Sequence, residues 1–244
     1  MTRKDRRNND SGDAALMALV RVIVARNVDK ACRLLAASPG LAAQALGVGA
    51  SRSSSQPYLF EVIMHYVYAG DTALHVAAAA YEPRIGQALL RHGARPGARN
   101  RRGAEPLHYA VDGVPGSHTW NPDAQQAIVR LLLEAGANPN SADNSGVTPL
   151  HRAVRTRCAA AVHALLAGGA DSRRKNQNGS TPLHLAVQNT GRGGTGSAPA
   201  QEQQKEIILL LLQHGARPKD KDTQGKTVVQ SAVSGWIREL LRGN

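Results

Sequence analysis

Aromatic side chains are scarce in this sequence: Phe, Trp and Tyr make up only 3% of its 244 residues. Apolar residues nevertheless reach 42%, and most of them are Ala, Leu and Val. This content is enough for a core, but a core of small side chains. Small side chains let helices pack closely, so the composition favours packed helices over a thick sheet sandwich.

Cysteine is also scarce. Cys32 and Cys158 are isolated from each other in the sequence, and each lies in an apolar helical context. Two cysteines form neither a disulfide framework nor a zinc motif. Nothing in the sequence therefore indicates an oxidising compartment.

Long hydrophobic runs are missing. The best apolar stretch, residues 14–25, is interrupted by Arg21 and is shorter than the roughly 20 residues that span a bilayer. Asp10 and Asp13 separate it from the basic start, and no small-residue cleavage site follows, which argues against a signal peptide. We expect a cytoplasmic protein without membrane insertion, whose residues 1–12 form a disordered basic tail.

Acidic residues are outnumbered. There are 18 Asp and Glu against 30 Lys and Arg, which gives a formal net charge of +12. Such a surplus favours an acidic partner, such as nucleic acid, anionic lipid or an acidic protein face. The alternative is that the basic residues only solvate the surface.

A short phrase recurs along the chain and always ends in histidine. It reads Thr-Ala-Leu-His, then Glu-Pro-Leu-His, then twice Thr-Pro-Leu-His, and its copies end at His75, His108, His151 and His184. The first two histidines are 33 residues apart, and so are the last two, whereas 43 residues separate the middle pair. A phrase that recurs at this period indicates a stacked repeat.

The repeat units share an order of signals. Each opens with a turn glycine: Gly70, Gly103, Gly146, Gly179 and Gly225. Two residues later, threonine marks a helix start, where its hydroxyl can accept from a free backbone N–H: Thr72, Thr148, Thr181 and Thr227. A second helix is expected over residues 85–91, 127–134, 160–167 and 207–213, each followed by a glycine that can adopt the left-handed conformation: Gly93, Gly136, Gly169 and Gly215.

These phrases, with Leu-Leu-x-x-Gly-Ala and Ala-Asn-Pro-Asn, resemble ankyrin repeats over about residues 67–244. The resemblance implies an all-α solenoid of stacked helix pairs with short β-hairpin fingers, in about five units. It also implies that the motif histidines and threonines bond within and between repeats. Two departures stand out: Glu105 replaces threonine, and the last unit, Thr227-Val228-Val229-Gln230, lacks the proline and the histidine.

The remaining chain divides accordingly. Residues 13–57 read as a degenerate N-terminal helical pair followed by a linker at residues 47–57, and residues 58–244 read as the array, with a C-terminal cap over 222–244. Two units carry insertions between their helices, at residues 113–123 and 190–203. Trp120 lies in the first insertion and either covers a neighbouring helix or contacts a partner. Long loops on a rigid scaffold are often functional.

Catalytic, metal and cofactor chemistry finds no support. Histidines at repeat spacing lie about 8–10 Å apart, too far to share a zinc ion with bonds of about 2 Å. The Gly225-Lys226-Thr227 turn lacks the leading glycine and the preceding strand of a phosphate-binding loop. We therefore expect no enzyme, no cofactor and no metal.

Ankyrin repeats commonly bind partners through their finger tips and the exposed face of their first helices. The resemblance therefore implies a contact surface at Tyr68, Arg101, Arg102, Asp112, Asn144, Arg155, Gln177, Asn178 and Gln188, to which Trp120 is added. A basic stripe is expected along the finger edge, carried by Arg95, Arg99, Arg101, Arg102, Arg173, Arg174, Lys175, Arg217, Lys219, Lys221 and Lys226.

These features predict a monomeric protein-binding scaffold for a partner with an acidic face. The alternative is a binder of nucleic acid or another polyanion that uses the same stripe, although the stripe has few aromatics for base stacking. A small enzyme in the first 66 residues is a third interpretation, but this segment lacks a catalytic set.

Overall fold

The computed structural model describes residues 3–113, 120–188 and 197–243, with side chains from residue 13 onward. The chain divides into two compact units, each described by itself below. The first unit comprises Met1–Ala110 and Asp123–Asn138, and the second comprises Val111–Pro122 and Pro139–Asn244.

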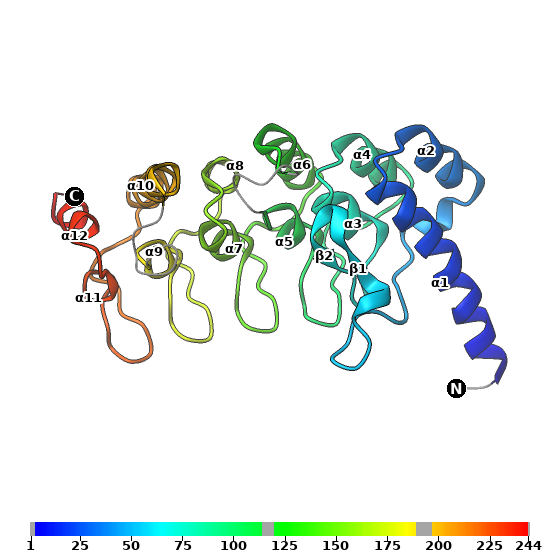
Figure 1. Ribbon diagram of the computed structural model, residues 1–244, viewed down its shortest axis with the longest axis horizontal. Helices are drawn as coiled ribbons and strands as arrows, with labels where there is room; N and C mark the ends of the chain where they lie inside the picture. The colour runs from blue at the N-terminus through cyan, green and yellow to red at the C-terminus, as the bar shows by residue number, and fades with distance from the viewer. Residues whose placement is uncertain (1–2, 114–119, 189–196, 244) are drawn as a thin grey trace. The chain divides into compact units, whose positions relative to one another are not determined.

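The first unit contains six helices and one hairpin among its described residues (Figure 1). The helices are α1 (Arg3–Val24), α2 (Val28–Ala37), α3 (Ala73–Ala79), α4 (Pro83–Arg91), α5 (Pro106–Ala110) and α6 (Pro122–Glu134, whose first residue belongs to the second unit). Three short 3-10 turns are η1 (Pro39–Ala42), η2 (Gln56–Tyr58) and η3 (Glu61–Ile63). The antiparallel strands β1 (Leu59–Phe60) and β2 (His65–Tyr66) pair Leu59 with Tyr66 and Phe60 with His65.

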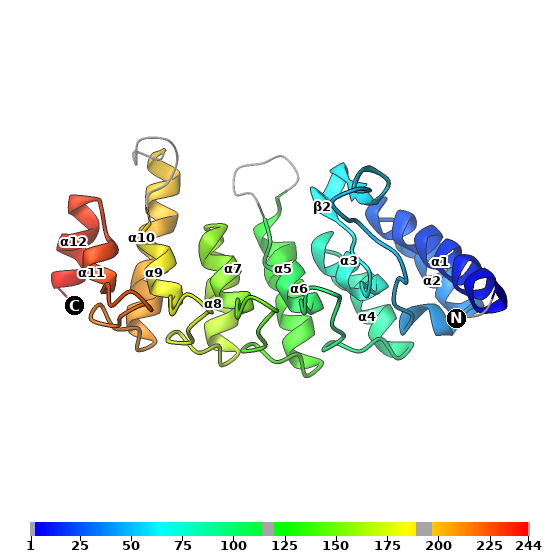
Figure 2. The ribbon, with the colours of Figure 1, turned by 90° about the horizontal axis from the view of Figure 1, so that it is seen from below.

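The second unit repeats the helix pair, again counted over its described residues. Its helices are α7 (Pro149–Arg155), α8 (Ala159–Ala167), α9 (Pro182–Ala186), α10 (Ala198–Gln213), α11 (Val228–Ser231) and α12 (Gly235–Arg242). In Figure 1, α8 and α10 lie on one side of α7 and α9, and the finger loops extend from the other side. The helix α10 is the longest described helix of this unit, as Figure 2 shows.

The core of the first unit combines large aliphatic side chains with the small side chains of the alanine-rich helix α3. Every residue of α3 is buried, and this helix packs against α1, α4 and α5. On α4, a Cβ added at Gly86 would lie 2.8 Å from Ile128 Cδ1 of α6, which real Cβ atoms essentially never do. A side chain at this site would therefore require the Ile128 side chain to move.

A capping box opens the first helix of four repeats, which confirms the predicted threonine caps. In α3, α7 and α9 the partner of the threonine is the motif histidine three residues on, and in α11 it is Gln230. At α7, the backbone N–H of Thr148 donates to His151 Nδ1 at 3.3 Å, and His151 N–H donates to Thr148 Oγ1 at 3.4 Å. Two backbone donors that the helix leaves unpaired are thereby satisfied.

The same histidines join neighbouring repeats. Because Nδ1 accepts from a backbone N–H, the proton of each ring sits on Nε2, which donates to a carbonyl in the following finger. The Nε2 atoms of His75, His151 and His184 lie 3.2, 3.0 and 3.4 Å from the carbonyl oxygens of Ala104, Ser180 and Lys226. The bonds within and between repeats that the resemblance implied are therefore present.

Glycines hold the left-handed turns where the sequence predicts them. All five turn glycines and all four glycines after the second helices have φ between +69° and +89°. At Gly70 a side chain would meet a second obstacle, because a Cβ there would lie 2.7 Å from Asn100 Cα. Both the dihedral angle and the packing therefore demand glycine at this turn.

Two predicted boundaries need correction in the N-terminal region. The helix α1 begins at Arg3, so residues expected in a disordered tail belong to a helix. They contain no proline, and extending a formed helix costs less than starting one. The expected linker, residues 47–57, is docked on the array: Ala50 is buried, and its N–H donates to Val67 O at 2.8 Å.

The two insertions are partly helical, which also differs from expectation. Residues 114–119 and 189–196 lie outside the described residues, but α6 begins at Pro122 and α10 at Ala198, both within the expected loops. A buried glutamine ties each extended helix to the end of the preceding one. Gln125 donates to Ala110 O at 3.1 Å, and Gln204 donates to Ala186 O at 2.7 Å. These bonds satisfy helix-end carbonyls and favour the added turns.

The capping boxes predict a cost for removing a threonine hydroxyl. Thr148→Ala and Thr181→Ala should each lower the free energy of unfolding by about 0.5–2 kcal/mol. Thr148→Ser retains the hydroxyl and should stay within a few tenths of a kcal/mol of the wild type. Denaturant unfolding monitored by circular dichroism measures all three, and an equal loss in the serine variant would contradict the capping role.

The histidine links predict that acid weakens the fold. Burial lowers the pKa of His75 and of His151, against the raising effect of nearby carboxylates and carbonyls. An unfolded histidine titrates near pH 6.5, so below about that pH the unfolded chain binds more protons than the folded one. This contribution to stability is complete above about pH 6.5 and is lost as the pH falls below it.

The measurement compares unfolding midpoints at neutral and mildly acidic pH. His151→Gln keeps an acceptor for Thr148 N–H, as Gln230 does for Thr227 N–H at 2.8 Å, but it cannot take up a proton. This variant should show a smaller drop on acidification than the wild type. His163→Gln, at an exposed position on α8, is the control and should keep the full drop.

Candidate functional site

Three of the predicted contact residues come together in the first unit. Tyr68 precedes α3, and Arg101 and Arg102 form the tip of the finger between α4 and α5. The guanidinium carbons of Arg101 and Arg102 lie 5.5 and 5.0 Å from the centre of the Tyr68 ring. Both distances are within the range of cation–π attraction.

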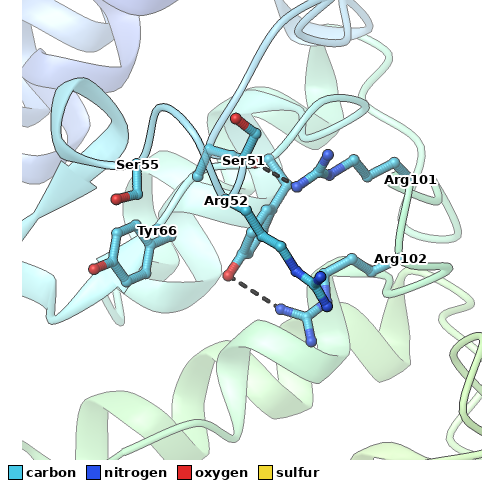
Figure 3. A pocket seen from close by; sticks show the side chains of 8 residues that line it. Ser51, Arg52, Ser55, Tyr66, Arg101 and Arg102 are labelled. Atoms are coloured by element: carbon cyan, nitrogen blue, oxygen red, sulfur yellow. Dashed lines mark hydrogen bonds between the residues drawn. The ribbon is translucent and has the colours of Figure 1, made fainter.

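Hydrogen bonds fix the two guanidinium groups further (Figure 3). Arg102 Nη1 donates to the Tyr68 hydroxyl at 3.1 Å, and Arg101 Nη2 donates to the carbonyl oxygen of Ala50. These residues line a cavity of about 260 Å³ together with Ser51, Arg52, Ser55 and Tyr66. We call it the arginine pocket; among the side chains that the structure describes, its lining includes three arginines and no carboxylate.

The segment that sequence reasoning took for a linker forms one wall of this pocket. The carboxylate of Asp13 on α1 accepts from the backbone N–H groups of Gly47 and Val48, at 3.0–3.1 Å. A Cβ added at Gly49 would lie 2.4 Å from backbone atoms of Tyr68 and Ala69. Glycine therefore lets this wall lie directly against the backbone that carries the Tyr68 ring.

The buried carboxylate of Asp71 links the Tyr68 backbone to Asn100, the residue that precedes Arg101 and Arg102. Asp71 is fully buried and accepts from Tyr68 N–H at 2.6 Å, from Asn100 Nδ2 at 2.9 Å and from the Tyr109 hydroxyl at 2.8 Å. Asn100 Oδ1 in turn accepts from Arg102 N–H at 2.9 Å. One buried ion, satisfied by three donors, thus sets the position of the tyrosine relative to the arginine tip.

The finger tips share a turn residue that sequence reasoning missed. In each of four fingers an Asp or Asn oxygen accepts from the backbone N–H groups two and four residues later: Asn100, Asp143, Asn176 and Asp222. Each stands three residues before a turn glycine. This Asp/Asn-x-x-Gly pattern follows the same period as the histidines and could have been found from it.

Predicted contact residues of the second unit lie on neighbouring tips. Asn144, Gln177 and Asn178 are exposed. Gln177 Nε2 donates to Asn144 O at 2.8 Å, and Gln177 N–H donates to Ser145 O at 3.2 Å. Each tip is therefore bonded to its neighbour, and the Asn144 and Asn178 side chains are carried on a fixed backbone.

Asp112 has a structural contact that the contact-surface prediction did not include. Arg152 on α7 donates to Asp112 at 2.9 Å and to Asp143 at 3.1 Å. Burial disfavours the charge of Asp143, but the N–H groups of Ser145 and Val147 and the Arg152 guanidinium outweigh it, so the pKa of Asp143 is lowered. The same two carboxylates overcome the burial of Arg152 and raise its pKa.

The other predicted residues are separate from these groups. Arg155, at the end of α7, and Gln188, after α9, are exposed, and the Gln188 carbonyl accepts from Gln204 Nε2 at 2.8 Å. Trp120 is half-buried.

The basic stripe is less uniformly positive than its residue list suggests. Arg173 makes two bonds of 3.0 Å to Asp220, and Arg99 lies 3.7 Å from Glu105. Lys175 donates to the backbone oxygen of Lys221 at 2.7 Å. The predicted stripe residues are divided between the two units, and the arginine pocket belongs to the first.

Comparison with known proteins identifies the repeat. The family model for ankyrin repeats (3 copies) matches residues 50–143 and 123–222, which is more than half of the chain. A comparison with curated proteins found no match. In the described part of the chain, no helix combines the length and apolarity that crossing a bilayer requires. Ankyrin repeats are generally protein–protein interaction modules, and the family is typically non-enzymatic. The histidine links, the capping boxes and the family match together show that this chain belongs to the ankyrin-repeat family.

Proposed function

We propose that the chain is a non-enzymatic scaffold that binds a protein partner with an acidic face. The observation that supports this proposal is the arginine pocket, where Tyr68, Arg101 and Arg102 meet at a finger tip and no described carboxylate contributes to the lining. Tyrosine and arginine are enriched among the residues that dominate binding energy. Arginines already held in place lose less conformational freedom on binding than free ones.

Polar residues of the second unit are proposed as further contacts with the partner. Asn144 and Asn178 are exposed on its finger tips, Arg155 is exposed at the end of α7, and Gln188 is exposed just after α9. Such groups contribute hydrogen bonds and specificity at an interface more than raw affinity. Half-buried Trp120 is included as a candidate contact.

Nucleic-acid binding is the rival function, and the contacts favour it less. Arg99 and Arg173 each face a carboxylate, so the stripe offers a phosphate backbone less free charge than the sequence implied. The guanidiniums of Arg101 and Arg102 already lie over the Tyr68 ring. A nucleic-acid base would have to displace them in order to stack on this ring. We place the protein-binding role in the cytoplasm, where thiols such as those of Cys32 and Cys158 stay reduced.

Charge reversal tests the proposed surface. Partners are identified by co-purification and mass spectrometry, and affinity is then measured by calorimetry at low and physiological salt. Arg101→Glu/Arg102→Glu should weaken binding by roughly tenfold or more and flatten its salt dependence, because screening acts on the removed charges.

The matched control is Arg84→Glu/Arg91→Glu, which makes the same change of charge at exposed positions of α4. It should retain the wild-type affinity. An equal loss in both variants would show that net charge alone drives binding. Co-purification of nucleic acid instead of a protein, again lost with Arg101 and Arg102, would favour the rival function.

A further inference from the structure

We propose that the arginine pocket binds a phosphate monoester carried by the protein partner, namely a phosphorylated serine or threonine side chain. The inference rests on the proposed function and adds the chemical class of the group that enters the pocket. The evidence lies in the pocket's charge, its donors, its size and the way its side chains are held.

Charge is the first argument. Four other arginines in the described residues face carboxylates: Arg26 faces Glu82, Arg99 faces Glu105, Arg152 faces Asp112 and Asp143, and Arg173 faces Asp220. Arg157 and Arg238 donate instead to backbone carbonyls. The arginine pocket gathers three guanidiniums in one place, and no Asp or Glu among the described side chains contributes to its lining. A phosphate monoester carries a charge of about −1.5 to −2 at neutral pH, so it neutralises more of the positive charge of three guanidiniums than one carboxylate does.

The donor set is the second argument. In Figure 3, the Arg52 and Arg102 side chains extend toward one another from two different loops, whereas the Ser51 and Ser55 hydroxyls point away from these two side chains. Guanidinium forks bind phosphate through paired N–H bonds. The terminal oxygens of a phosphate monoester accept from several donors, and the guanidiniums of two loops supply such donors from different directions.

Size and preorganisation are the third argument. The cavity, at about 260 Å³, is below the roughly 300–1,000 Å³ of pockets for drug-sized ligands. It therefore suits one anionic group on a side chain. Arg101 and Arg102 are fixed on Tyr68, and Tyr68 and Asn100 are both fixed by buried Asp71. Part of the ordering cost of these long side chains is thus met before a ligand arrives.

The test uses three peptides that differ at one residue. A central phosphoserine, glutamate or serine is flanked by alanines, and binding to the full chain is measured by fluorescence anisotropy. The phosphoserine peptide should bind about tenfold more tightly than the glutamate peptide, and inorganic phosphate should compete with it. Equal binding of the phosphoserine and glutamate peptides would overturn the proposal.

Variants assign the binding to the pocket. Arg52→Ala and Arg102→Ala should each remove the preference for phosphoserine, and Arg102→Lys should restore little of it, because lysine keeps the charge but loses the fork. Arg91→Ala on α4 is the matched control and should bind like the wild type. Circular dichroism checks that each variant is folded, and Arg52, which is exposed and lies on a loop, is the change that least threatens the fold. Retention of the preference in the folded Arg52→Ala variant would overturn the assignment.

Two further arms separate this inference from its rivals and from the proposed function. The affinity for the phosphoserine peptide is compared with that for single-stranded RNA and for vesicles that contain phosphorylated inositol lipid. Tighter binding to the RNA or to the vesicles would overturn the inference that a protein partner carries the phosphate. Once a partner is identified, phosphatase treatment should reduce its binding. Binding that survives phosphatase but is lost in Arg101→Glu/Arg102→Glu would leave the proposed function standing and overturn the phosphate inference alone.

Discussion

The stack depends on one bonding arrangement, in which a neutral histidine is held from both sides. Its Nδ1 accepts the N–H of the threonine that begins the first helix, and its Nε2 donates to a carbonyl in the next finger, as at His75, His151 and His184. The first bond fixes the tautomer that the second requires. A protonated ring would lose the Nδ1 acceptor but keep the Nε2 donor, so acid acts on the helix cap and not on the bond between repeats.

The arginine pocket shows how a general repeat acquires a particular surface. Asp71 directly precedes the cap residue Thr72, whereas Ala104, Val147, Ser180 and Lys226 hold that place in the other units. A buried carboxylate there is tolerated because three donors surround it. Those donors belong to the Tyr68 backbone, to the residue that anchors the arginine tip and to a core tyrosine. The ion that stabilises the turn therefore also sets the geometry of the pocket.

The two long units show where sequence reasoning loses accuracy. Residues 113–123 and 190–203 make their two units longer than the repeat. A loop was therefore expected in each, and the extra turns of α6 and α10 were not predicted. Gln125 and Gln204 explain these turns, since each is buried and bonded to the end of the preceding helix. A glutamine in a polar stretch carries no periodic signal, and only its partner in space reveals its role. The Asp/Asn-x-x-Gly turns, in contrast, recur with the repeat and were open to detection.

The sequence by itself determined the elements that local chemistry controls. Glycines with positive φ, threonine caps and the histidine period are each set within a few residues, so helix order and repeat boundaries could be predicted. Tyr68, Arg101 and Arg102 could also be named as contact residues, since the repeat places them near finger tips. Only the tertiary structure showed that they meet over one ring and that Arg52 joins them. The bond from Arg101 to Ala50 spans 51 residues, and the wall that carries Ala50 is held by Asp13 on another helix. Such contacts depend on how distant segments pack, which residue spacing does not encode.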